Sequence, residues 1–161
     1  MNYKKKTYTY EEALISLQKY CIYQDRSHME VEKKLKEMSM IPEVVNKIII
    51  SLIEQDYLNE ERFAFNYARG KFKLKKWGKR RLKAELKRKG VTSNLISLAL
   101  DQISDFDYKR TFDELANKKA SSINSGSILK NRKKLADYLI HRGWETTLVY
   151  DKLNEIFKKN N

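Results

Sequence analysis

The sequence predicts an all-α protein built of three tandem three-helix repeats, which form an elongated, curved array. Three observations support this prediction. Apolar residues recur at helical spacing along nearly the whole chain. Glycine and proline, which interrupt regular structure, number only five and one. The apolar pattern also repeats with a period of about 51 to 53 residues.

Start signals place the helices of the first repeat. Thr9 or Thr7 can cap the first helix. Ser27, followed three residues later by Glu30, forms a capping-box pattern for the second. Pro42 suits the first turn of the third helix, where the N–H that proline lacks has no helical partner to lose. The first repeat is therefore expected to hold three helices joined by short turns.

Later signals continue the same pattern. Asn59 caps a fourth helix, and Gly78 separates it from a fifth that Gly90 ends in a left-handed C-cap. A seventh helix is expected from about 107 to 120. The stretch from 121 to 127 is rich in Ser, Asn and Gly and is the clearest loop. Thr92 or Ser93 caps a sixth helix, an eighth runs to residue 142, and a ninth runs from about 145 to 157, so nine helices are expected.

Self-comparison aligns the three repeats without gaps, column by column. The helix-end column is the most informative, because Ser39, Gly90 and Gly143 coincide and each precedes an apolar residue. The other columns are Val31/Leu82/Leu135, Leu35/Leu86/Leu139, Met40/Val91/Trp144, Val45/Ile96/Val149, Ile49/Leu100/Leu153 and Leu52/Ile103/Ile156. We expect domains at 1–57, 58–104 and 105–161, each burying apolar faces partly against its neighbours.

Nothing in the sequence favours an enzyme, a cofactor or a metal site. The two histidines, His28 and His141, lie far apart in sequence, and the chain has neither a P-loop nor a dinucleotide-binding fingerprint. Cys21 is the only cysteine, so no internal disulfide can form, which fits a reducing cytoplasm. No stretch approaches the roughly 20 apolar residues of a membrane span, so no membrane partner is expected.

Positive charge is concentrated in the middle of the chain. Residues 1–58 carry nine basic and nine acidic side chains, residues 59–104 thirteen and four, and residues 105–161 twelve and eight. The formal net charge of +13 therefore comes mainly from the central third. An anionic partner would be attracted there.

The segment from Arg69 to Lys89 holds twelve Lys or Arg residues and a single acid, Glu85. Such a run can be an ordinary solvated face. However, inert helix surfaces usually mix both signs, and like charges four residues apart, as in Lys79, Lys83 and Lys87, cost helix stability. We therefore favour a binding face for phosphates or for an acidic protein surface.

A sequence-reading DNA-binding helix is not expected. The helix after Gly90 follows the turn as a recognition helix would, but it contains no Lys or Arg. The cations lie on the preceding helix and on its approach. Contact with a nucleic-acid backbone or with an acidic protein fits this arrangement better than base readout does.

Two runs resemble the central signature of the RecX family: Leu58 to Arg69, with its acidic pair followed by Arg-Phe-Ala and a Tyr, and Trp77 to Val91, with its Gly, basic residues, Glu-Leu and Lys-Gly-Val. Two positions depart from the pattern, since Lys79 follows the glycine where the family often has proline, and Ser39 replaces a glycine. The signature positions are Arg62, Phe63, Tyr67, Gly78 and Gly90.

This resemblance implies a regulator of RecA. The sequence leaves the oligomeric state open, and a monomer is the default expectation. It would bind the RecA nucleoprotein filament in its helical groove and modulate ATP hydrolysis, filament growth and strand exchange, most often by inhibition, and so affect DNA repair and the SOS response. The expected contacts with RecA or DNA are Lys73, Lys76, Lys79, Arg80, Arg81, Lys83, Lys87 and Arg88. Phe63 and Tyr67 are expected in the core, and Arg62 fits either place.

A second hypothesis remains open. The basic central repeat could instead hold single- or double-stranded DNA non-specifically, with any effect on filaments being secondary. Direct phosphate binding should weaken steeply as salt rises.

Overall fold

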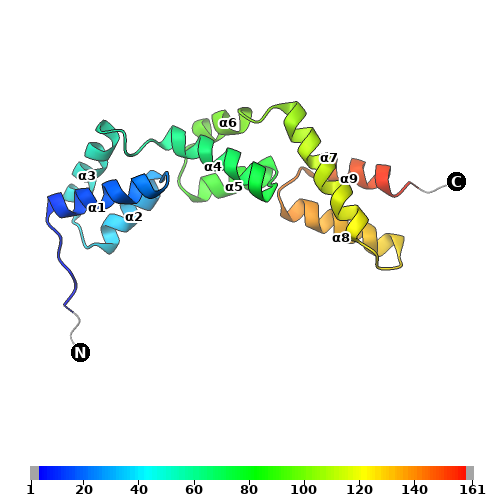
Figure 1. The fold of residues 1–161 in the computed structure, drawn as a ribbon, viewed down its shortest axis with the longest axis horizontal. Helices are drawn as coiled ribbons and strands as arrows, with labels where there is room; N and C mark the ends of the chain where they lie inside the picture. Colours follow the sequence, from blue (N-terminus) through cyan, green and yellow to red (C-terminus); the bar gives the residue numbers. More distant parts are fainter. Residues whose placement is uncertain (1–3, 159–161) are drawn as a thin grey trace.

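The computed structural model describes residues 4–158, and every regular element among them is a helix (Figure 1). The helices follow one another along an elongated arc, as the sequence predicts. They are α1 (Tyr10–Tyr23), α2 (His28–Glu37), α3 (Pro42–Glu54), α4 (Glu60–Lys75), α5 (Lys79–Arg88), α6 (Ser93–Asp101), α7 (Asp105–Ser122), α8 (Ile128–His141) and α9 (Thr146–Ile156). No helix among the described residues is long and apolar enough to cross a membrane.

The helix starts agree closely with their sequence signals. Ser27 and Glu30 make both hydrogen bonds of a capping box, at 3.1 and 3.0 Å. Thr9 and Asn59 cap α1 and α4, and Pro42 is the first residue of α3. Both ends of the seventh helix differ from the prediction: α7 runs from Asp105 to Ser122, so Ser121 and Ser122 belong to the helix and not to the expected loop. Its first turn is capped by Ser104, whose hydroxyl accepts a hydrogen bond from a backbone N–H.

The helix-end column of the repeat has one geometry in all three units. Ser39, Gly90 and Gly143 have φ of 61°, 79° and 90°, in the left-handed region. In each unit the next residue, which is Met40, Val91 or Trp144, donates its N–H to a carbonyl five residues back. This is the Schellman motif, which satisfies the last carbonyls of a helix. The repeat therefore has the same backbone turn in each copy.

Each unit has an apolar cluster. That of α1–α3 is centred on fully buried Leu17, Leu35 and Leu52, and that of α4–α6 on Phe63 and Leu86. The third cluster fills α7–α9 and also takes in Phe72, Leu82 and Ile103 of the middle unit. The domain boundaries after residues 57 and 104 stay a prediction, and residues 1–3 and 159–161 of the outer domains lie outside the described residues.

The middle and C-terminal units meet where two glycines bring backbones together. A Cβ on Gly78 would lie 2.4 Å from the carbonyl oxygen of Gly143, and one on Gly143 would lie 2.2 Å from the Cβ of Arg81. The N–H of Gly78 donates to Arg142 at 2.8 Å, and that of Arg80 to Gly143 at 3.1 Å. No larger residue fits either position without displacing this contact.

Aromatic side chains complete the same junction. Trp144, fully buried, donates from its indole Nε1 to the carbonyl of Lys76 at 3.1 Å. The hydroxyl of Tyr108 accepts from the N–H of Lys79 at 2.9 Å and donates to Glu145. Because this phenol is buried, its pKa lies far above the ordinary value, although the N–H of Lys79 favours the ionised form. Tyr108 therefore stays protonated and keeps both hydrogen bonds.

We expect Gly143→Ala to destabilise the protein much more than Gly126→Ala. Both residues have positive φ, 90° and 73°, so both variants incur the left-handed penalty of about 1–2 kcal/mol. Nothing lies within 4 Å of a Cβ at Gly126, whereas Gly143 faces Arg81. Overpacking should therefore reduce the free energy of unfolding of Gly143→Ala by roughly a further 1–3 kcal/mol. Urea denaturation of both variants measures this difference. Equal losses would contradict this account of the junction.

Ser39→Gly should stabilise the protein by about 0.5–1 kcal/mol, because glycine adopts a φ of 61° without the steric penalty of an L side chain. The matched control is Ser97→Gly, an exposed serine inside α6, which should lose roughly 0.5 kcal/mol of stability through lower helix propensity. Thermal unfolding of both variants measures the difference. A loss of stability in both would show that Ser39 makes a compensating interaction.

Candidate functional site

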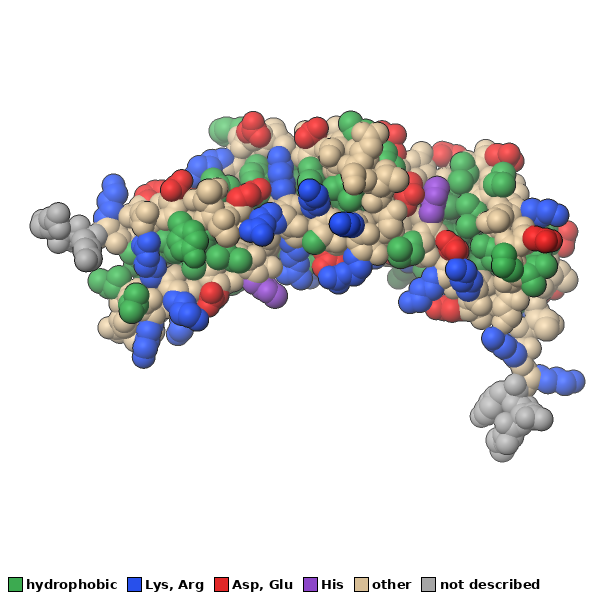
Figure 2. Space-filling model, turned by 180° about the vertical axis from the view of Figure 1, so that it is seen from behind, with side chains coloured by type: hydrophobic (Ala, Val, Ile, Leu, Met, Phe, Trp, Pro, Cys, Tyr) green, Lys and Arg blue, Asp and Glu red, His purple; other side chains and the backbone are tan. Residues whose placement is uncertain are grey.

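Helix α5 separates its residues into a buried and a cationic side. Leu82 and Leu86 are fully buried. The side chains of Arg80, Lys83, Lys87 and Arg88, on the opposite side, are exposed. In Figure 1, α5 lies on the inner side of the arc and α6 on the outer side. In the middle of the arc, Lys and Arg side chains extend over the visible face to its inner edge (Figure 2).

The approach to α5 extends this cationic surface. Lys73 and Lys76 are exposed at the end of α4. Lys76 ends the helix with a φ of 55°, and its carbonyl receives the Trp144 indole. This backbone bond fixes the position of the turn that carries the lysine side chains. We call the six exposed residues the basic face: Lys73, Lys76, Arg80, Lys83, Lys87 and Arg88.

Two residues of the expected contact set are placed differently. Lys79 and Arg81 are partly buried at the junction with the C-terminal unit. The guanidinium of Arg81 lies 4.2 Å from the centre of the Trp77 ring and donates to the carbonyl of His141 at 3.3 Å. The ammonium of Lys79 lies 4.9 Å from the ring of Tyr108. Both side chains therefore help to hold the two units together.

The basic face has little internal neutralisation. Glu85, the only acid in α5, is partly buried and lies 3.5 Å from Arg88. Within residues 4–158, Arg80, Lys83 and Lys87 form no ion pair with a carboxylate. Their mutual repulsion would be relieved by an anionic partner. The geometry thus supports binding of phosphates or carboxylates over the inner side of the arc.

The signature residue Arg62 joins the first and second units. Its Nε and Nη1 donate to Asp25 and Asp56, both at 3.1 Å, and its Nη2 donates to the carbonyl of Asp56 at 3.1 Å. Partial burial lowers the pKa of Arg62, but the hydrogen bonds to the two carboxylates outweigh it and raise that pKa above its ordinary value. Arg62, left open by the sequence, therefore lies in a structural junction.

Further ion pairs surround Arg62. Lys89 lies 2.8 Å from Glu30, whose hydrogen bond raises the pKa of the lysine, and His28 lies 3.4 Å from Glu60. The apolar clusters of the first two units share no buried residue. This junction is thus mainly ionic, whereas the second junction is apolar and bonded through the backbone. The sequence shows the charged residues but not that they converge.

Phe63 is buried, as expected for a core residue, and Tyr67 is half-buried beside it, with ring centroids 5.6 Å apart. Lys71 and Lys89 lie 5.5 and 5.6 Å from the centre of the Tyr67 ring. Tyr67 therefore contacts two lysines that do not belong to the basic face. Cys21, also buried, has a thiol pKa raised by that burial, so it is a poor nucleophile.

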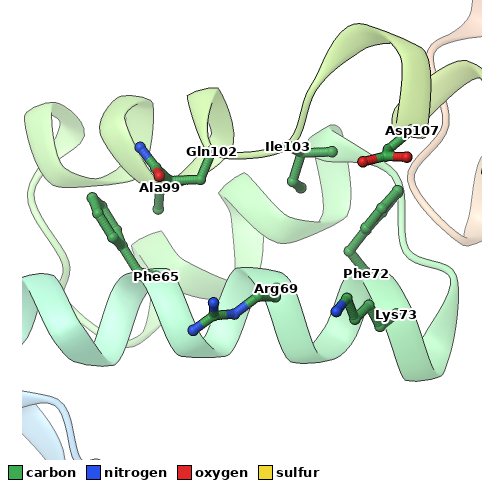
Figure 3. A pocket seen from close by; sticks show the side chains of 8 residues that line it. All are labelled: Phe65, Arg69, Phe72, Lys73, Ala99, Gln102, Ile103 and Asp107. Carbon is green, nitrogen blue, oxygen red and sulfur yellow. The ribbon is translucent and has the colours of Figure 1, made fainter.

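Sequence reasoning missed a pocket between α4, α6 and the start of α7 (Figure 3). It has a volume of about 250 Å³ and lies beside Lys73 of the basic face. Its lining combines apolar and polar side chains: Phe65, Arg69, Phe72, Lys73, Ala99, Gln102, Ile103 and Asp107. The spacing of Phe65, Arg69 and Lys73, each four residues apart, was the only signal for a shared helix face.

Comparison with known proteins agrees with the repeat architecture. Residues 59–100 match the family description "RecX, second three-helix domain". The chain is 29% identical over 140 residues to the regulatory protein RecX of Clostridium acetobutylicum, covering 84% of this chain and 64% of the relative. It is 27% identical over 146 residues to that of Bacillus cytotoxicus, covering 91% and 54%. The chain thus spans between half and two thirds of the length of these curated relatives.

Two solved structures share the fold. The crystal structure of RecX from Lactobacillus salivarius superimposes with a TM-score of 0.78 at 24% identity, covering 91% of this chain and 95% of the other. A second crystal structure, of a regulatory protein RecX, gives a TM-score of 0.79 at 23% identity, covering 91% and 71%. At these identities the likeness concerns the fold.

Fold and surface together define a helical-repeat protein with a cationic middle unit. Residues 4–158 contain no group of three or more potential metal ligands. The matched signature lies in that middle unit. In the sequence of this unit and in its overall fold, the chain resembles regulatory proteins RecX.

We expect Arg62→Ala to loosen the first unit from the second without changing helical content. The side chain joins Asp25, Asp56 and two backbone carbonyls, and no shared apolar cluster replaces it. Small-angle X-ray scattering should show a larger radius of gyration than in the wild type at about 0.1 M salt. At about 1 M salt, where the Debye length falls to roughly 3 Å, the radius of gyration of the wild type should approach that of Arg62→Ala.

The control for this measurement is Lys109→Ala, which removes an exposed ion pair within α7, 2.7 Å from Asp113, and leaves the junction intact. Its scattering should equal that of the wild type. Identical scattering for Arg62→Ala and the wild type at both salt concentrations would mean that the ionic junction does not hold the units together.

Proposed function

We propose that this protein binds RecA–DNA filaments and inhibits ATP hydrolysis by RecA, filament growth and strand exchange. The similarity to regulatory proteins RecX supports RecA as the partner. The observation that carries the proposal is the basic face on the inner side of the arc, where Arg80, Lys83 and Lys87 lie unpaired among the described residues. It would meet acidic side chains or phosphates in a filament groove.

The arc suits such a partner. A filament groove is itself curved, so an elongated arc can follow it and contact several RecA protomers at once. The rigid second junction, with the Gly78 and Gly143 backbones in contact, would keep the basic face aligned with the C-terminal unit. The ionic first junction would let the N-terminal unit adjust to the surface it meets. We propose that the protein acts as a cytoplasmic monomer.

A second candidate function is non-specific DNA binding through the middle unit. The same basic face favours it, because cations without acidic neighbours bind any phosphate backbone. Such binding would not depend on RecA. It would weaken linearly on a plot of log affinity against log salt, with a slope of about −0.9 per phosphate contact on duplex DNA.

The decisive variant reverses Arg80, Lys83 and Lys87 to Glu. Wild-type protein should suppress RecA ATP hydrolysis on single-stranded DNA below one copy per RecA, and the variant should require at least about tenfold more protein, the equivalent of roughly 1.4 kcal/mol. All three side chains are exposed and make no ion pair among the described residues, so circular dichroism should be unchanged. Binding to the same DNA without RecA is measured in parallel.

The matched control reverses Lys130, Lys133 and Lys134 on α8, which are also exposed and change the net charge by the same amount; it removes one exposed ion pair, between Lys133 and Asp137 at 3.3 Å. It should inhibit RecA like the wild type. If the folded α5 variant inhibits normally, the basic face is not the contact surface. Unchanged hydrolysis by the wild type, with tight and salt-sensitive DNA binding, would favour the second candidate function.

A further inference from the structure

We propose that the pocket between α4 and α6 accepts one unstacked base of a single-stranded nucleic acid, while Arg69 and Lys73 hold the adjoining phosphates. This contact goes beyond the proposed action on RecA filaments, because it needs no RecA. Its evidence is the lining of the pocket, which combines aromatic rings, two cations and two hydrogen-bonding groups within one small cavity.

The walls of the pocket suit a flat ring. Phe65 and Phe72 rise from α4 at either end of the pocket (Figure 3). Ala99 of α6 and Ile103, which follows the end of that helix, face them from across the cavity. Phe72 is held in place by its stacking against Tyr108, with centroids 6.0 Å apart. Bases of single strands stack on such aromatic and apolar surfaces irrespective of sequence.

The size of the pocket limits its occupant. Its volume is about 250 Å³, which corresponds to roughly eight water molecules at about 30 Å³ each. Sites for drug-sized ligands begin near 300 Å³. One ring system fits this space, and an extended ligand must leave the rest of its length outside. A base attached to a backbone that runs along α4 meets this condition.

The cations lie where such a backbone would run. Arg69 and Lys73 are one helical turn apart on α4, and both side chains are exposed beside the pocket. Arg69 donates to Asn66 at 2.6 Å through Nη2 alone, which leaves other guanidinium N–H groups for a phosphate. Lys73 also belongs to the basic face, so a strand leaving the pocket at this end would continue onto a cationic surface.

The polar rim distinguishes a base from an apolar side chain of a partner protein. Gln102 offers a donor and an acceptor. Asp107 offers Oδ2, since Arg110 contacts its Oδ1 at 3.1 Å. A leucine or phenylalanine would cover these groups without replacing their hydrogen bonds to water, which costs free energy. The amino group of a base can donate to Asp107, whereas the ionised side chain of an acidic peptide can only accept hydrogen bonds.

This chemistry predicts which nucleic acids bind. Duplex DNA should bind worse than a single strand, because its bases are stacked and paired. Cytosine and adenine carry an exocyclic amino group that can donate to Asp107, and thymine does not. Oligo(dC) and oligo(dA) should therefore bind more tightly than oligo(dT), and Asp107→Asn should reduce that preference.

The test uses fluorescence anisotropy of the full chain with labelled oligonucleotides of about 12 residues, within the site sizes of single-strand binders. The probes are oligo(dC), an oligomer of equal charge with abasic sites throughout, oligo(dT) and a duplex. The abasic strand should bind about 5- to 150-fold more weakly than oligo(dC), the loss expected for one stacked base. Equal binding of the two strands would overturn the proposal.

Variants locate the contact. Phe65→Ala should abolish the difference between oligo(dC) and the abasic strand, whereas Phe106→Ala, which removes an exposed ring outside the pocket lining, should leave it intact. Arg69→Glu should weaken all strands, and Lys47→Glu, an exposed reversal on α3, should not. If Phe65→Ala lowers thermal stability, Asp107→Asn tests the pocket independently, because this residue is exposed on the rim. The measured quantity is then the preference for oligo(dC) over oligo(dT).

Two other outcomes would also overturn the proposal. A loss of binding in Arg69→Glu without any dependence on bases would mean that only phosphates are held. Displacement of the oligonucleotide by an acidic, leucine-containing peptide, together with indifference to the bases, would assign the pocket to a protein segment. Because RecA is absent from this assay, failure here leaves the proposed filament function to be decided by the α5 variants.

Discussion

The start of α5 is the constraint on which the rest of the arrangement depends. A helix leaves its first N–H groups without intrahelical partners, and here Gly78 at the N-cap has no side chain to supply one. Cations in the first turn also oppose the helix dipole. The C-terminal unit provides the partners instead: Arg142 and Gly143 receive the N–H groups of Gly78 and Arg80, and Tyr108 receives that of Lys79.

This constraint links the stability of α5 to the orientation of its cations. A helix as basic as α5 would be unfavourable in isolation, because its like charges repel one another. Docking its N-terminus onto the next unit stabilises it and at the same time fixes the direction in which Lys83 and Lys87 point. The two glycines are required because only a residue without a side chain allows the backbones to approach this closely.

The two junctions of the array differ in kind, and the difference has mechanical consequences. The second junction has a shared apolar cluster and direct backbone bonds, so the middle and C-terminal units should move as one body. The first depends mainly on ion pairs centred on Arg62, which salt can weaken. For the proposed function, one rigid and one adjustable connection would let the array follow a long helical surface.

The sequence by itself determined the helices, their repeat and the basic stretch, because these depend on local periodicity and capping. Even the turn column of Ser39, Gly90 and Gly143 was visible, since left-handed residues favour glycine. Only the tertiary structure decided which cations are free. The sequence does not distinguish Lys79 and Arg81 from the exposed cations beside them, but both lie at the junction between the middle and C-terminal units. The pocket and the Arg62 network also join residues far apart in the chain, which local patterns cannot specify.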